Sequence, residues 1–306
     1  PSRYIDDTAL GEGNGVQSRL TAIEERRSKA EANLKKVKQV LHDCAPVILE
    51  DVADSIKATG AAYTKLFGSL QKAVMAEVAR LVQDLLSTAP GGGSEKVLQP
   101  KSKHYPLLSD PEDPLFMIAL LKDAQFAKKL LDAFAALIVS KVFGSEAKFA
   151  PLKSVERGVV KVYEKYDCRF DKLTDVARVT IVCADECVLR DVLKELKKAV
   201  EDGAVRIYRI KFRLGADYDA AEAGGYRDVL INMAFPPKDG EEEDGLHLVE
   251  LQLNLAAFLD IKSGGGHASY SVGRILQAFD TPTTTYTGMA TPDVVRDMQT
   301  GLIKKA

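Results

Sequence analysis

The sequence predicts an α+β protein in which a mixed β-sheet, flanked by helices, follows an α-helical region. Apolar residues recur at helical spacing from residue 17 to residue 86. The stretches 205–214 and 248–255 instead alternate apolar and polar residues, as half-buried strands do, and 226–235 lies between them as a third candidate strand. This succession of helical and strand patterns is typical of layered domains.

Composition and charge limit the class of protein. The chain has 306 residues, 46% hydrophobic and 28% charged, enough for one large or two ordinary domains. A formal net charge of −2 argues against a general DNA-coating role, so any positively charged site must be local. The four cysteines lack metal-ligand spacing, which indicates reduced thiols. Without a signal peptide or a run of about 18 apolar residues, we expect no membrane association and a cytoplasmic location.

Three helices are expected in the N-terminal region. Pro46 and the pair Thr59-Gly60 interrupt the helical pattern, because proline and glycine are strong helix breakers. The expected helices therefore cover residues 17–43, 47–59 and 61–87. They would form a hairpin or small bundle that could contact a protein partner or a second copy of the chain.

A glycine-rich segment, Thr88–Ser94, separates this region from the rest of the chain and is flexible by composition. We therefore expect a helical domain at 1–90, a linker at 91–106 and a sheet-containing domain at 107–306.

The sheet-containing domain is expected to include two further helices. Asp113 and Pro114 are residue types that begin helices, and the apolar pattern that follows to residue 143 predicts a helix buried on several sides. The run 179–183 is rich in β-branched residues and predicts a strand. Residues 188–200 then form an amphipathic crossover helix.

Helical spacing places Lys153, Arg157 and Lys161 on one face. Like charges at this spacing cost about 0.2–0.5 kcal/mol per pair unless a polyanion or carboxylates lie opposite. The alternative is an ordinary surface helix, on which Glu156 and Glu164 offset the cations.

Polar residues gather on one face of the predicted strands. One face of the first strand carries Arg209, Lys211 and Arg213, and one face of the last carries Glu250, Gln252 and Asn254. Asp175, before the strand at 179–183, is either a turn residue or a functional group. The basic face is either a phosphate site or an edge strand whose cations prevent edge-to-edge pairing.

Taken in order, these residues resemble the RelA/SpoT family of alarmone synthetases over about residues 148–278, less than half of the chain. The motifs are Lys153-Ser154-x-x-Arg157-x-x-x-Lys161, Asp175-x-x-Arg178, Lys211-Phe212-Arg213, Gly225-Tyr226-Arg227-Asp228 and Val249-Glu250-Leu251-Gln252. The resemblance implies a nucleotidyltransferase-like fold. It also implies a Mg²⁺-dependent pyrophosphokinase that transfers pyrophosphate from ATP to the 3′ hydroxyl of a nucleotide such as GDP or GTP.

The resemblance also implies roles for individual residues. Asp175 resembles the magnesium-binding aspartate, and Glu250 resembles the second acidic residue, a metal ligand or a base that activates the hydroxyl. With Arg178, these are the expected catalytic residues. Tyr226 resembles the tyrosine that stacks on the acceptor base. The expected nucleotide- and phosphate-binding residues are Lys153, Ser154, Arg157, Lys161, Arg209, Lys211, Arg213, Tyr226, Arg227, Gln252, Asn254 and His267.

The chain departs from the family pattern after two of these motifs. It has Asp228 and Leu230 where familiar synthetases have serine and histidine, and Leu253-Asn254 where they have a basic residue and threonine, so we expect a different acceptor pocket. The four scattered histidines form no His-Asp pair of the alarmone-hydrolase type, so we expect no alarmone degradation.

Two other functions stay open. The chain could be a nucleotide-binding or interaction module without turnover, or a toxin-like enzyme that modifies an RNA 3′ end, which would make RNA a partner. A DNA-repair-type nucleotidyltransferase fits less well, because its two-carboxylate strand signature is not evident.

Overall fold

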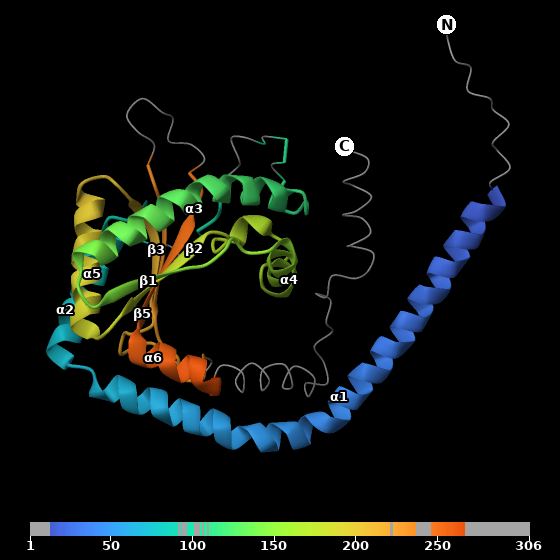
Figure 1. Ribbon diagram of the computed structural model, residues 1–306, viewed down its shortest axis with the longest axis horizontal. Coiled ribbons are helices and arrows are strands. Elements are labelled where there is room, and N and C mark those ends of the chain that lie inside the picture. The colour runs from blue at the N-terminus through green and yellow to red at the C-terminus, as the bar shows by residue number, and fades with distance from the viewer. Residues whose placement is uncertain are drawn as a thin grey trace, which may run out of the picture. The chain divides into compact units, whose positions relative to one another are not determined.

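The computed structural model describes residues 13–90, 93, 97–100, 105, 107–108, 110–220, 223–236 and 246–266 (Figure 1). By their packing these residues divide into two compact units, one ending at Ile56 and one beginning at Lys57. The second unit contains the sheet and every described site residue. The predicted linker lies largely outside the described residues, and the domain boundaries stay a prediction.

The N-terminal helical region consists of α1 (Gly13–Ser69) and α2 (Lys72–Ser87). The predicted breaks at Pro46 and Thr59-Gly60 are wrong, because α1 continues through both. A proline removes one backbone hydrogen bond and a glycine costs about 1 kcal/mol, which a long helix can absorb. The chain turns instead before α2, where the backbone N–H of Gln71 donates to Glu186 Oε1 at 2.9 Å. A tertiary contact therefore accompanies the turn.

The remaining helices surround the sheet. They are α3 (Phe116–Lys141), α4 (Val155–Lys165), α5 (Glu186–Glu201) and α6 (Ala256–Ile261), with a 3₁₀ turn η3 (Phe170–Lys172) and a π-helical turn η5 (Lys262–Gly266). The predicted helices at 115–143 and 188–200 are confirmed. The prediction that the first of these helices, α3, is buried on several sides is wrong, because its residues Phe126, Leu130 and Leu137 are exposed. None of the described helices is long and apolar enough to span a membrane.

Within the described residues, the sheet has five strands in the order β1-β2-β5-β4-β3. They are β1 (Ser145–Phe149), β2 (Arg178–Cys183), β3 (Arg206–Phe212), β4 (Val229–Ala234) and β5 (Val249–Leu255). Only β2 and β5 pair in parallel, so the predicted mixed sheet is confirmed. Sequence analysis missed β1, a short edge strand without a hydrophobic run.

One face of the sheet is the wall of the hydrophobic core. Cross-strand register joins four buried residues into an apolar row: Val179, Leu251, Ile231 and Ile210. The core continues into α2, α3 and α5. Figure 1 shows α2 and α5 together on one side of the sheet and α4 on the other. The alternate residues of the same strands therefore face away from this core.

Candidate active site

Strand register brings the predicted polar residues into one row across the sheet. Glu250 on β5 pairs with Arg178 on β2 and with Asn232 on β4, and Asn232 pairs with Arg209 on β3. Directly paired residues project from the same face. A register shift between Ile207 and Arg209 lets β3 bury Ile207 and Ile210 while Arg209 stays in the polar row. The row therefore places a buried carboxylate between two arginines.

The next row along the strands orients Glu250. Gln252 pairs with Thr180, whose Oγ1 donates to Gln252 Oε1 at 3.1 Å, and Gln252 Nε2 donates to Glu250 Oε1 at 2.6 Å. The predicted polar face of β5 is thus a hydrogen-bonded chain that holds the Glu250 carboxylate in place. Lys211 lies in the same row, at the edge of the sheet.

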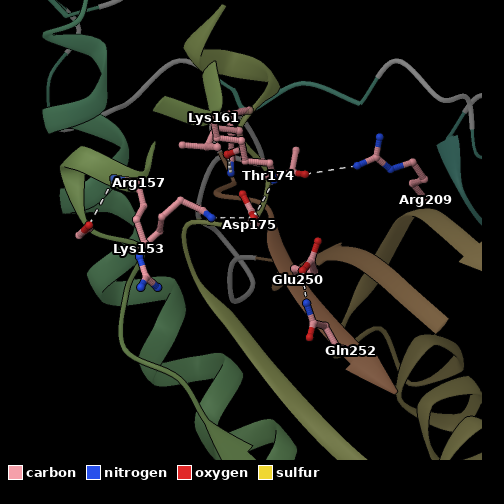
Figure 2. A network of polar contacts seen from close by, with 11 residues as sticks. Lys153, Arg157, Lys161, Thr174, Asp175, Arg209, Glu250 and Gln252 are labelled. Atoms are coloured by element: carbon pink, nitrogen blue, oxygen red, sulfur yellow. Dashed lines mark hydrogen bonds and ion pairs between the residues drawn. The ribbon is translucent and has the colours of Figure 1, made fainter. Parts of the chain in front are cut away.

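Asp175 lies just before β2, where two lysines converge on it (Figure 2). Lys153 Nζ is 2.9 Å and Lys161 Nζ 2.8 Å from Asp175 Oδ2. The Ser154 side chain caps α4 by accepting from the backbone N–H of Arg157 at 3.3 Å. The carboxylate that could offset the predicted row of cations is therefore Asp175, which is only 7% exposed.

The two carboxylates differ in their electrostatics. Burial raises the pKa of Asp175, but Lys161 and Lys153 outweigh this effect and hold the pKa below its ordinary value. Burial and the nearby charge of Asp175 raise the pKa of Glu250, despite the hydrogen bond from Gln252. Two acidic groups whose pKa values are pushed apart suit acid–base chemistry. Asp175 is kept charged, and Glu250 takes up a proton more readily.

A glutamine that sequence analysis missed connects the segments that carry both carboxylates. Gln99 Nε2 donates to Leu173 O at 3.2 Å and to Leu248 O at 2.9 Å, and its Oε1 accepts from Leu248 N–H at 2.9 Å. Leu173 and Leu248 each lie two residues before a carboxylate. Gln99 thus fixes the approach of both segments to the site.

The other end of the polar face is built around Tyr226. Its hydroxyl donates to Asn254 Oδ1 at 2.9 Å. Tyr63 of α1 meets its ring edge-on, with centroids 5.9 Å apart, and Lys262 Nζ lies 4.4 Å from its ring centroid. Tyr63 also stacks on Phe258 at 5.8 Å. The predicted base-stacking tyrosine is therefore enclosed by other side chains in this structure.

Arg227 and Arg213, which are both predicted to bind phosphate, have protein partners in the loop before β4 and at its ends. Arg227 donates to the backbone carbonyls of Arg213, Gly215 and Tyr218 at 3.0, 2.9 and 3.0 Å, and its guanidinium carbon is 4.0 Å from the Phe67 ring centroid. Arg213 Nη1 is 2.9 Å from Asp228 Oδ1. The loop before β4 is thereby held in place. His267 lies outside the described residues, so its role stays a prediction.

The site also contains two polar residues that sequence analysis did not select. Arg209 Nη2 donates to Thr174 Oγ1 at 3.3 Å, and Arg209 Nε and Nη2 donate to Asn232 Oδ1 at 2.9 and 2.6 Å. Asn232 lies on the polar face of β4, and the other residues of this strand are all apolar. That one polar residue among apolar ones was the signal that could have identified it.

Asp175 and Glu250 are the carboxylates of this site that could bind a metal ion. Asp175 Oδ1 is buried without a hydrogen-bond partner. The described residues contain no group of three or more His, Cys, Asp or Glu side chains arranged to hold an ion. Magnesium commonly binds one or two carboxylates together with substrate phosphates, so this donor set fits magnesium better than a metal enclosed by protein ligands.

No family model matches the sequence, and no curated protein does. The solved structures that are similar to this chain include the following three. The first is the Type VI effector Tas1 in complex with its immunity protein, with 22% identity and a TM-score of 0.33, covering 59% of this chain and 82% of that chain. The second is small alarmone synthetase 1 from Bacillus subtilis bound to its product pppGpp, with 14% identity and a TM-score of 0.37, covering 63% of this chain and 100% of that chain. The third is a protein from Streptococcus mutans UA159, with 14% identity and a TM-score of 0.28, covering 63% of this chain and 96% of that chain. At these identities and TM-scores, nothing about the activity of this chain follows from the similarity.

Proposed function

We propose that the chain is a magnesium-dependent pyrophosphokinase that transfers pyrophosphate from ATP to the 3′ hydroxyl of a nucleotide such as GDP or GTP. The observation that supports it best is the pair of buried carboxylates with opposite pKa shifts, Asp175 and Glu250. Basic residues of two strands, of α4 and of the segment before α4 lie beside this pair: Arg178 on β2, Arg209 on β3, Lys161 and Lys153.

Transfer of a phosphoryl-type group depends mainly on positioning and on electrostatic stabilisation of negative charge. In the proposed reaction the acceptor hydroxyl oxygen bonds to the β-phosphorus of ATP, and the bond from that phosphorus to the bridging oxygen of AMP breaks. The hydroxyl proton passes to Glu250, whose raised pKa favours its acceptance. Lys153, Lys161 and Arg178 offset the charge of the donor phosphates.

Asp175, through its unpartnered Oδ1, would hold the magnesium ion. Of the two roles that the resemblance implies for Glu250, a second metal ligand or the base, the proposal assigns it that of the base. Bound magnesium would neutralise phosphate charge. Tyr226 is the proposed stacking partner of the acceptor base. Stacking on the face beneath Lys262 Nζ would require that side chain to move, because it lies 4.4 Å from the ring centroid.

The test is transfer of label from γ-labelled ATP in the presence of Mg²⁺ to each of GDP, GTP, ADP, ATP and bulk tRNA. The proposal expects labelled nucleotide whose formation stops on chelation of the metal. Labelled tRNA would indicate an enzyme that modifies RNA ends instead. Binding of nucleotide without any transfer would indicate a module without turnover, and either result would refute the proposal.

A further inference from the structure

Two buried side-chain atoms in the described part of the chain have no hydrogen-bond partner, Asp175 Oδ1 and Asn232 Nδ2. Buried polar groups are normally satisfied, and an unpaired one destabilises the fold, so each needs an explanation. The proposed metal would account for the aspartate oxygen. It leaves the amide nitrogen of Asn232 unexplained, and Asn232 is 3% exposed.

The orientation of the Asn232 amide is fixed by Arg209. Arg209 Nε and Nη2 both donate to one amide atom, at 2.9 and 2.6 Å. A guanidinium has donors only, so the amide atom that faces it must be the oxygen. Thr174 Oγ1 accepts from the same guanidinium at 3.3 Å and holds it from a second side. The NH₂ group of Asn232 is therefore turned away from Arg209.

The neighbour of Asn232 on the other side of the row is Glu250, its direct cross-strand partner. Gln252 donates to Glu250 Oε1 at 2.6 Å, and among the described residues no hydrogen bond reaches Oε2. A donor with a fixed direction thus lies next to a carboxylate with an available oxygen. The group that fits both is a hydroxyl, since it accepts one hydrogen bond and donates another. A phosphate oxygen fits less well, because a second anion beside Glu250 would be repelled.

We infer that Asn232 is a substrate-binding residue whose Nδ2–H donates to the oxygen of the acceptor hydroxyl, while that hydroxyl donates its proton to Glu250. The inference rests on the proposed function and deepens it, because it assigns the residue that selects an alcohol as the acceptor. After transfer the same oxygen bridges carbon and phosphorus and can still accept from Nδ2. Arg209 and Thr174 are positioning residues, since they act through the Asn232 amide.

The test is a binding cycle that needs no turnover. Calorimetry measures the affinity of the full chain, with Mg²⁺, for GDP and 3′-deoxy-GDP, and for ADP and 3′-deoxy-ADP. Wild type should prefer the 3′-hydroxyl form of at least one pair by about three- to tenfold, the range of one neutral hydrogen bond. Asn232→Asp keeps an oxygen for Arg209 but replaces the donor, so the preference should fall to near one.

Thr174→Val removes the other Arg209 partner but leaves the Asn232 donor in place, so it should lower the preference less than the Asn232 variants do. Lys198→Ala, at an exposed position of α5, is the control, and its preference should match wild type. Asn232→Leu, nearly equal in size, provides a second test without added charge. An equal preference in wild type and both Asn232 variants would overturn the inference and leave the proposed function intact. If the Asn232 variants lost the same affinity for the hydroxyl and the deoxy nucleotides, the inference would also be overturned, because the Asn232 donor would then contact another part of the nucleotide. If none of the four nucleotides bound wild type, the proposed function would fail together with the inference.

Discussion

At the scale of single residues, the ion pairs of Asp175 connect stability to the proposed chemistry. Two lysines contact one oxygen of a carboxylate that is almost fully buried. Asp175→Asn should lower turnover by at least about 100-fold, because the charge that would bind the metal is lost. It should also lower the melting temperature, since removal of one partner leaves buried charges uncompensated. Thermal denaturation and the labelled-ATP assay measure both effects.

Asp167→Asn is the matched control, because Asp167 pairs with Lys172 at 2.9 Å but is 90% exposed. Asp167→Asn should change neither turnover nor melting temperature, since exposed ion pairs contribute little.

The folded pKa of Asp175 lies below its ordinary value. The ionised Asp175 carboxylate therefore stabilises the folded protein at pH values above the ordinary aspartate pKa of about 4. This stabilisation is lost as the pH falls through the folded pKa of Asp175. A wild-type rate in Asp175→Asn would rule out the metal assignment.

Glu250 should show the opposite relation between stability and pH. Its folded pKa is raised, so the ionised form destabilises the native protein at neutral pH. Glu250→Gln should raise the melting temperature at pH 7. The difference should shrink as the pH falls through the raised folded pKa and should vanish below the ordinary glutamate pKa of about 4.3. Turnover should fall by about 100-fold or more through loss of the proton acceptor. A variant less stable than wild type at neutral pH would contradict this account.

At the scale of elements, the end of α1 supports the loop that carries Tyr226. Gly225 has a φ of +88°, and a Cβ there would lie 2.9 Å from the Tyr63 Cβ, so loop and helix are in close contact. Tyr63→Ala should weaken acceptor binding more than ATP binding, because it frees the Tyr226 ring. Tyr63→Phe keeps the ring contacts and should behave as wild type. Calorimetric titration of both nucleotides tests this, and equal losses for acceptor and ATP would show a general loss of structure.

The position of β3 makes both interpretations of its basic face testable. β3 is an edge strand of the described sheet, which fits the interpretation that its cations prevent edge-to-edge pairing. Lys211 also lies in the same cross-strand row as Gln252, which fits the interpretation that it binds phosphate. If Lys211 binds phosphate, Lys211→Ala should weaken ATP binding by about 1.5–3 kcal/mol, and less at higher salt. Arg213→Ala is a poorer probe, since it would leave the buried Asp228 unpaired.

The exposed Lys198 of α5 provides the control for this titration. Lys198→Ala removes the same charge from a helix that packs on the core side of the sheet, so ATP affinity should stay at the wild-type value. Unchanged affinity in Lys211→Ala together with greater aggregation would instead assign the basic face to protection of the edge.

At the scale of the whole molecule, the division at Ile56 and Lys57 predicts which part of the chain folds by itself. A chain that begins at Lys57 should keep the melting temperature and nucleotide affinity of the sheet-containing unit. A chain that begins at Lys72 should lose acceptor binding, since it lacks Tyr63 and Phe67, which contact Tyr226 and Arg227. Equal behaviour of the two fragments would show that the end of α1 is dispensable and would favour a boundary nearer residue 90.

The sequence by itself determined four of the five described strands and the crossover helix, because a period of two or of 3.6 residues is local information. The order of these elements along the chain then predicted a mixed sheet. The sequence also identified Asp175 and Glu250 as acidic candidates and a row of cations that needed a counter-charge. It could not predict β1, which is short and polar, nor the uninterrupted course of α1 through Pro46.

Only the tertiary structure decided which polar groups meet. Cross-strand register places Asn232 between Arg209 and Glu250, and the packing of α1 places Tyr63 against Tyr226. Gln99 reaches Leu248 from a segment with no regular pattern of its own. These contacts join residues far apart in the chain, and no local periodicity records them. The opposite pKa shifts of Asp175 and Glu250 have the same origin, because burial and neighbouring charges exist only once the chain has folded.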